Sequence, residues 1–276
     1  MNRLSLNQRT QIVNLLVEGG SLRAISRITG CSINTVTKLL VDVGEACLEF
    51  HNEQVKNVTS KRVQCDEIWS FVYSKQKNVP ENKEGHAGDV WTWVGIDADT
   101  KLVISYLVGD RTAEDASIFM HDIASRLKNR VQLTTDGLKS YLEAVNDAFG
   151  NNIDYSQLVK LYNGDTLAES NERKYSPIEY TGAKKTWIKG NPDNKHVSTS
   201  FVERQNLTMR MHMRRFTRLT NAFSKKIANH EYAIALHFVY YNFCKIHKTL
   251  RVTPAMEAGL IKDIMSIEDI VKLTNK

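Results

Sequence analysis

The chain has 276 residues and a mass of 31.4 kDa, which suffices for one large domain or for a catalytic core with a small additional domain. Apolar residues make up 42% and charged residues 25%, a composition that excludes a mainly disordered or low-complexity protein. The sequence contains no apolar run of 18 residues, and its first residues lack the apolar core of a secretion signal. We therefore expect a cytoplasmic protein without a membrane segment.

Charge is unevenly distributed along the chain, whose net charge is +6. Residues 66–202 hold 16 Lys and Arg against 20 Asp and Glu, whereas residues 203–252 hold 10 against 2. Such blocks can be solvated helix faces, or an acidic metal-binding centre beside a surface that binds phosphates. The four cysteines (Cys31, Cys47, Cys65 and Cys244) form no C-x-x-C pair, so we expect free thiols and neither disulfides nor a zinc ribbon.

The first fifty residues have a helical pattern only. A helix is predicted over Asn7–Glu18, with Ser21 and Ser32 as the N-caps of two further helices. Two short helices joined by a glycine turn are typical of a helix-turn-helix, although three small helices also occur in unrelated packing modules. We predict a DNA-binding domain over residues 1–50, whose last helix presents four polar side chains to a major groove: Asn34, Thr35, Thr37 and Lys38.

A linker over residues 51–61 is predicted to lead into a domain of mixed α/β layout. Periodicity predicts strands at 62–74, 90–97 and 101–108, followed by a helix at 112–128 and a strand at 131–135. A helix at 138–149 and a strand at 156–161 complete the predicted elements. Residues 162–197 are polar and lack a clear period, so we predict an inserted loop within a catalytic domain spanning 62–218. The pattern then becomes helical near 199–215 and 221–246, and residues 219–276 form a C-terminal helical region.

Three acidic residues stand out by their positions. Asp66 lies inside an otherwise apolar strand, where an unpaired charge is costly, and Asp136 follows the fourth strand, where α/β sheets place functional groups. Glu203 lies in the first turns of a helix. Converging carboxylates are ligands that Mg²⁺ prefers, so the trio predicts a metal site for phosphodiester chemistry, with Mn²⁺ able to substitute.

Each acid also has an ordinary structural interpretation, as an edge-strand charge, an Asp-Gly turn and a solvated helix residue respectively. The rival ligands are Glu67 and Asp97. Glu67 is ranked below Asp66 because neighbouring strand residues point to opposite faces. Basic residues on and after the helix of Glu203 are expected to contact DNA phosphates: Arg204, Arg210, Arg214 and Arg215.

These motifs resemble those of a known family. CDEIWSF, TTDGLKSY and SFVERQN are similar to the three acidic motifs of the DDE transposases, in particular the insertion-sequence-one type. The stretch YYNFCKIHKTLRVTPAMEAG resembles the tail shared by many insertion-sequence transposases and integrases. The resemblance covers roughly residues 62–260.

The resemblance implies a ribonuclease-H-like fold and Mg²⁺-dependent cleavage and strand transfer at the ends of an insertion sequence. Asp66, Asp136 and Glu203 match the catalytic triad, and Arg210 matches a basic position that often follows the glutamate. The implied partners are double-stranded DNA, as terminal repeats and target, and at least one further copy of the chain, with no small-molecule substrate. The implied location is the nucleoid of a prokaryotic cell.

One departure from the family pattern leaves the recognition of DNA ends open. Members of this group often carry a cysteine-based zinc segment ahead of the helix-turn-helix, which this sequence lacks, so recognition would rest on residues 1–50 or on a separate product. Two other functions are compatible with parts of the sequence: a DNA-binding regulator without catalysis, and a tyrosine strand transferase using Tyr240 or Tyr241 with His247. The second leaves the three acids unexplained.

Overall fold

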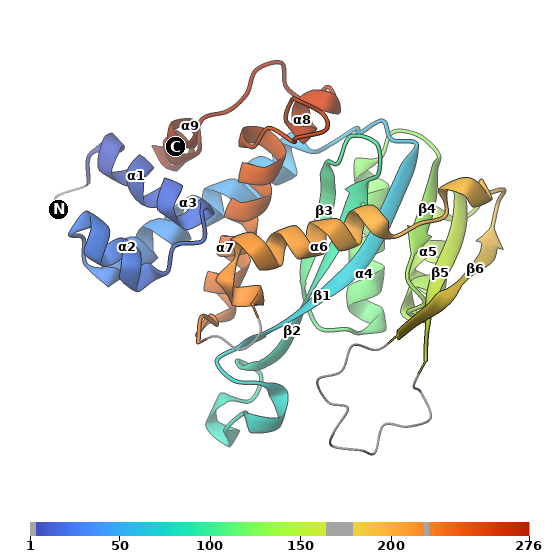
Figure 1. Ribbon diagram of the computed structural model, residues 1–276, viewed down its shortest axis with the longest axis horizontal. Coiled ribbons are helices and arrows are strands. Elements are labelled where there is room, and N and C mark those ends of the chain that lie inside the picture. Colours follow the sequence, from blue (N-terminus) through green and yellow to red (C-terminus); the bar gives the residue numbers. More distant parts are fainter. Residues whose placement is uncertain (1–3, 164–178, 218–220, 276) are drawn as a thin grey trace.

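The computed structural model describes residues 4–163, 179–217 and 221–275 (Figure 1). Within these residues the strands form one six-stranded sheet in the order β3-β2-β1-β4-β5-β6. β1 is antiparallel to β2 and parallel to β4; β2–β3 and β5–β6 are antiparallel, and β4–β5 is parallel. The strand bounds are Arg62–Val72, Gly88–Asp97, Val103–Gly109, Val131–Thr135, Ile153–Asn163 and Glu179–Lys189.

Helices cover both faces of the sheet. α6 (Ser200–His212) crosses the front of the sheet in Figure 1, and α4 (Ala113–Arg126) and α5 (Ser140–Phe149) lie behind it. On the rear face the buried Trp93 ring packs 5.8 Å from that of Phe119 and 5.4 Å from that of Tyr141. The predicted α/β class is therefore confirmed, and the layout is compatible with a ribonuclease-H-like fold.

The prediction of an inserted loop over residues 162–197 is wrong for its described part. β6 lies within this segment and pairs with β5 at the sheet edge, and a short 3-10 helix follows at Asn194–His196. β6 has several lysines and little apolar alternation, which suits an edge strand exposed to water but hides it from a periodicity search. Residues 164–178 of the predicted loop lie outside the described residues.

Two of the N-terminal helices begin directly after the serines that were predicted to cap them. Ser21 and Ser32 accept hydrogen bonds of 3.1 Å from the amides of Ala24 and Thr35, at the starts of α2 (Leu22–Thr29) and α3 (Ile33–Gln54); α1 spans Leu6–Val17. α3 is longer than predicted and runs past residue 50 into the expected linker. Its second half is held by burial, since Val43, Cys47 and His51 are fully covered or nearly so.

α3 packs side by side with α7 (Ile227–Val239), as Figure 1 shows. The two backbones approach so closely that a Cβ built on Gly44 would lie 2.3 Å from the Cβ of Tyr232. After α7 the chain continues through a π-helical turn (Tyr240–Cys244), α8 (Pro254–Glu257) and α9 (Ile267–Lys272), which returns to α1. The apolar core is therefore continuous from the N-terminal helices to the sheet.

None of the helices in the described part of the chain has the length and apolar character needed to cross a bilayer.

Replacing Gly44 by alanine tests this packing. We expect Gly44→Ala to lower the free energy of unfolding by about 1–3 kcal/mol, because the added methyl forces α3 and α7 apart. Urea unfolding followed by circular dichroism measures the effect. Glu45→Ala, at the exposed neighbouring position, is the control, and equal stability of the two variants would contradict the close approach.

Candidate active site

Asp66 and Asp136 meet because their strands are parallel neighbours. The β1–β4 ladder ends with Cys65 opposite Thr135, so the next residue of each strand lies at the same edge. One carboxylate oxygen from each of Asp66, Asp136 and Glu67 lies within 4.8 Å of the others. The Asp136 carboxylate also accepts a 3.0 Å hydrogen bond from the amide of Leu138, which fixes the turn after β4.

Glu203 forms another wall of the same cleft. The cleft has a volume of about 360 Å³ and is lined by Asp66, Asp136, Gly137, Leu158, Lys160, Thr199 and Glu203. The Glu203 carboxylate accepts a 2.5 Å hydrogen bond from the Thr199 hydroxyl and forms an ion pair with Lys160 of β5. The three predicted acids thus line one cleft, while Glu203 stands outside the tight group of carboxylates.

Two buried polar side chains dock α6 on β1. The Gln64 side-chain carbonyl accepts hydrogen bonds from the amides of Phe201 (2.8 Å) and Val202 (3.2 Å), at the open start of α6. The Asn206 side chain donates a 2.9 Å hydrogen bond to Asp66. Gln64 and Asp66 face α6 together because they are two residues apart on a strand. Neither Gln64 nor Asn206 was predicted as part of the site; for Gln64 the available signal is a polar residue among apolar ones in a strand.

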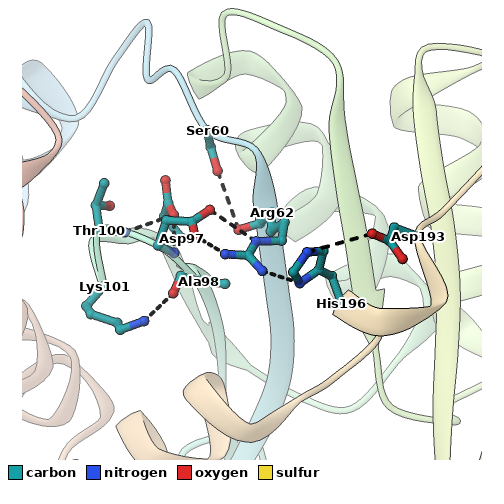
Figure 2. Close-up of polar contacts among 9 residues, drawn as sticks. Ser60, Arg62, Asp97, Ala98, Thr100, Lys101, Asp193 and His196 are labelled. Carbon is teal, nitrogen blue, oxygen red and sulfur yellow. Dashed lines mark hydrogen bonds and ion pairs between the residues drawn. The ribbon is translucent and has the colours of Figure 1, made fainter.

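A polar network at the start of β1 fixes the segment that leads into α6 (Figure 2). The Arg62 guanidinium contacts Asp99 in the β2–β3 turn and His196 in the 3-10 helix before α6. His196 in turn lies 3.7 Å from Asp193. The network therefore ties the turn, β1 and the approach to α6 together.

The rival ligand Asp97 belongs to this turn and not to the cleft. Its carboxylate accepts hydrogen bonds from the amides of Asp99 (2.7 Å) and Thr100 (3.2 Å), and Asp97 pairs with Val63. Glu67, by contrast, approaches Asp66 and Asp136 although it starts from the opposite face of the strand. Strand alternation ranked Glu67 below Asp66 as a ligand candidate, but the Glu67 carboxylate lies close to this group, which the alternation made unexpected.

The electrostatics of the cleft favour a bound cation. Burial raises the pKa of Asp66 to about 7, with further contributions from the charges of Asp136 and Glu203. Burial likewise raises the pKa of Glu67 to about 7, and it raises the pKa of Asp136. The side chains offer carboxylate oxygens, which are ligands suited to hard divalent ions such as Mg²⁺ and Mn²⁺.

Arg111 is a cation that already contacts this group. Its guanidinium lies 3.3 Å from Glu67, 3.7 Å from Asp136 and 4.8 Å from the centre of the Trp91 ring. Arg111 follows β3 and is 38% exposed, so one accessible guanidinium serves two carboxylates. It was not identified from the sequence, because it lies between a strand and a helix without a motif.

The predicted DNA-contacting residues occupy two surfaces. At the start of α3, Asn34 and Lys38 are exposed, Thr35 and Thr37 are half-exposed, and Lys38 forms an ion pair with Asp42. On and just after α6 lie three exposed arginines, Arg204, Arg210 and Arg214.

Arg215 differs from these arginines. Its guanidinium donates a 2.7 Å hydrogen bond to Ser224, and burial lowers its pKa to about 10. This side chain is half-buried and bonded to a neighbouring segment of the chain.

Comparisons with known proteins add little to this geometry. No protein-family model matches the chain, and no curated protein matches it. One similar solved structure is the Mos1 transposase paired-end complex with left transposon end (TM-score 0.25, 14% identity), where the match covers 56% of this chain and 60% of that one. Another is the Mos1 Strand Transfer Complex (TM-score 0.26, 13% identity, 86% and 78% covered). Similarities of this size do not establish membership of the insertion-sequence-one family, which stays a prediction.

The burial of Asp66 beside other carboxylates predicts a stabilising substitution. The pKa of Asp66 is raised from 3.8 to about 7 by folding, so its contribution to stability is complete below about pH 4 and is lost as the pH rises through 7. In chelator at pH 8, Asp66→Asn should raise the free energy of unfolding by about 1–3 kcal/mol. Asp263→Asn, at an exposed position, serves as the control. Equal stability of wild type and Asp66→Asn in urea unfolding at pH 8 would contradict the cost of ionising the buried Asp66 carboxylate.

Proposed function

We propose that this chain is a DDE-type transposase, which binds the ends of an insertion sequence and cleaves and joins DNA with divalent cations. The observation that carries the proposal is the convergence of Asp66, Asp136 and Glu203 on one cleft from β1, the end of β4 and α6. Three acids from distant parts of the chain, in a cleft with a basic helix along it, suit a phosphodiester substrate better than a small molecule.

Asp66, Asp136 and Glu203 are the residues that would hold Mg²⁺ or Mn²⁺. A divalent cation bound there supplies Lewis-acid activation of a water or 3′-hydroxyl and stabilises the leaving oxygen. Thr199 holds the Glu203 carboxylate in place through its hydroxyl, and Asn206 orients Asp66. Lys160 and Arg111 flank the acids and are positioned to receive the negative charge of the scissile phosphate.

The DNA would follow the exposed arginines of α6. Arg204 and Arg210 lie on the helix that carries Glu203, so phosphate contacts there would set the register of the scissile strand at the cleft. The start of α3 would read the terminal repeats as the second helix of a helix-turn-helix. Pairing two ends would require at least two copies of the chain.

The catalytic part of this proposal predicts loss of activity without loss of binding. With Mg²⁺ or Mn²⁺ the purified protein should nick or join DNA carrying the element's ends. Asp136→Asn should reduce the rate at least about a hundredfold, because a ligand carboxylate is neutralised. A gel assay with labelled ends measures the products, and an electrophoretic shift in chelator measures binding.

Asp263→Asn is the matched control and should cleave at the wild-type rate. Cleavage by Asp136→Asn at the wild-type rate, or cleavage by the wild type in excess chelator, would contradict the metal mechanism.

The proposed role of α3 predicts a separate loss of end recognition. Asn34→Ala combined with Lys38→Ala should weaken binding to the terminal repeats by about 1–3 kcal/mol, while affinity for unrelated duplex falls less. Fluorescence anisotropy at fixed salt measures both affinities. Lys56→Ala removes the same charge just beyond α3 and is the control; an equal loss of both affinities in the double variant would contradict sequence reading by this helix.

A further inference from the structure

Basic side chains from three separate segments of the chain gather beside α6. Arg204 is exposed on the helix itself, Lys101 comes from the β2–β3 turn, and Lys245 and His247 follow the π-helical turn. Burial lowers the pKa of His247, and the charges of Lys101, Lys245 and Arg204 lower it further. The three cations, which we call the basic row, therefore lie near one imidazole although they are far apart in the sequence.

Two members of the basic row are held at opposite ends of α6. The Lys101 ammonium lies 3.3 Å from the centre of the Phe201 ring, in the first turn of the helix, and also contacts the Ala98 carbonyl (Figure 2). The Lys245 ammonium donates a 2.9 Å hydrogen bond to His212, the last residue of the helix. The basic row thus follows α6 over about 17 Å, the rise between positions 201 and 212.

The charges of the basic row are not neutralised by nearby acids. Within the part of the chain that the structure describes, no carboxylate forms an ion pair with Lys101, Arg204 or Lys245. Asp99 shares the β2–β3 turn with Lys101, but it is paired with Arg62. Like charges that gather without acidic partners repel one another, so a ligand with several negative charges would stabilise them.

The far end of the basic row adjoins the N-terminal helices. Glu18, the C-cap of α1, acts on the charge of Lys245 and accepts a 3.3 Å hydrogen bond from Tyr240. The next residue, Gly19, lies so close to the end of α6 that a Cβ built on it would be 2.7 Å from the His212 carbonyl oxygen. The basic row therefore leads from the cleft end of α6 to the end of α1.

We propose that Lys101, Arg204 and Lys245 bind successive phosphates of duplex DNA where it passes between the cleft and the N-terminal helices. The β2–β3 turn and the segment after α7 thereby become part of the DNA-binding surface. Phosphates of one strand advance by about 3.4 Å along the duplex axis, so the basic row spans about five of them. Arg204 directly follows Glu203, so a strand bound there would continue into the cleft. The inference deepens the proposed function and rests on it for DNA as the partner.

The salt dependence of DNA binding tests the basic row. Lys101→Gln combined with Lys245→Gln removes two of its charges, and Lys56→Gln combined with Lys128→Gln removes two exposed charges elsewhere as the matched control. Fluorescence anisotropy of a labelled duplex of unrelated sequence measures the affinity of the full chain in chelator, between about 0.05 and 0.2 M salt. We expect the Lys101 and Lys245 variant to lower the slope of log affinity against log salt by about 2, and to bind at least about tenfold more weakly at about 0.1 M salt. The control should stay within about twofold of the wild type.

A charge-preserving variant separates phosphate binding from a structural role. Lys101→Arg combined with Lys245→Arg should keep the wild-type slope, and equal losses in the arginine and glutamine variants would overturn the proposal. Wild-type slope and affinity in the glutamine variant would overturn it as well. If that variant binds DNA normally but changes the sedimentation of the free chain, the basic row joins two copies of the chain and does not bind DNA. A wild type that binds no duplex at all would refute the proposed function together with this inference, so the two failures are distinguishable.

Discussion

The parallel pairing of β1 with β4 is the constraint on which the site depends. Its register places Cys65 opposite Thr135, and the residues that follow, Asp66 and Asp136, are forced together at the edge where the ladder stops. Burial is the main cause that raises the pKa values of Asp66 and Asp136, and repulsion from neighbouring carboxylates adds to it. The surrounding cations, Arg111 and Lys160, each contact members of the group and offset part of that repulsion.

Glu203 lies in the cleft with Asp66 and Asp136 because the whole of α6 packs against β1. The Gln64 side chain satisfies the first amides of α6, Asn206 ties the helix to Asp66, and the Arg62 network holds the segment before it (Figure 2). Each contact joins β1 to α6 or its approach. The relative position of two distant acids is therefore set by hydrogen bonds that themselves take no part in the chemistry.

Much of this arrangement could be predicted from local patterns. Strand content, turn residues and the polar exceptions at Asp66 and Asp136 indicated the sheet and its acidic edge, and Ser21 and Ser32 marked the helix starts. The edge strand β6 was not predicted because its apolar residues do not alternate regularly with polar ones. The extent of α3 depends on burial against α7, and the approach of Glu67 depends on where β4 ends. Both features depend on tertiary contacts, so they cannot be predicted from a local stretch of sequence.

The length of α3 has a consequence for any DNA that the protein holds. This helix has 22 residues, so it is a rod of about 33 Å whose first turn carries the exposed Ile33 and Asn34 and whose far half packs against α7. A rod anchored in this way does not bend or swing. If the start of α3 binds a DNA sequence while the cleft binds the strand to be cut, the protein fixes the distance between the bound sequence and the position of the cut. Inserting base pairs between them would then leave the cut at the same distance from the bound sequence and shift it away from the original cleavage position.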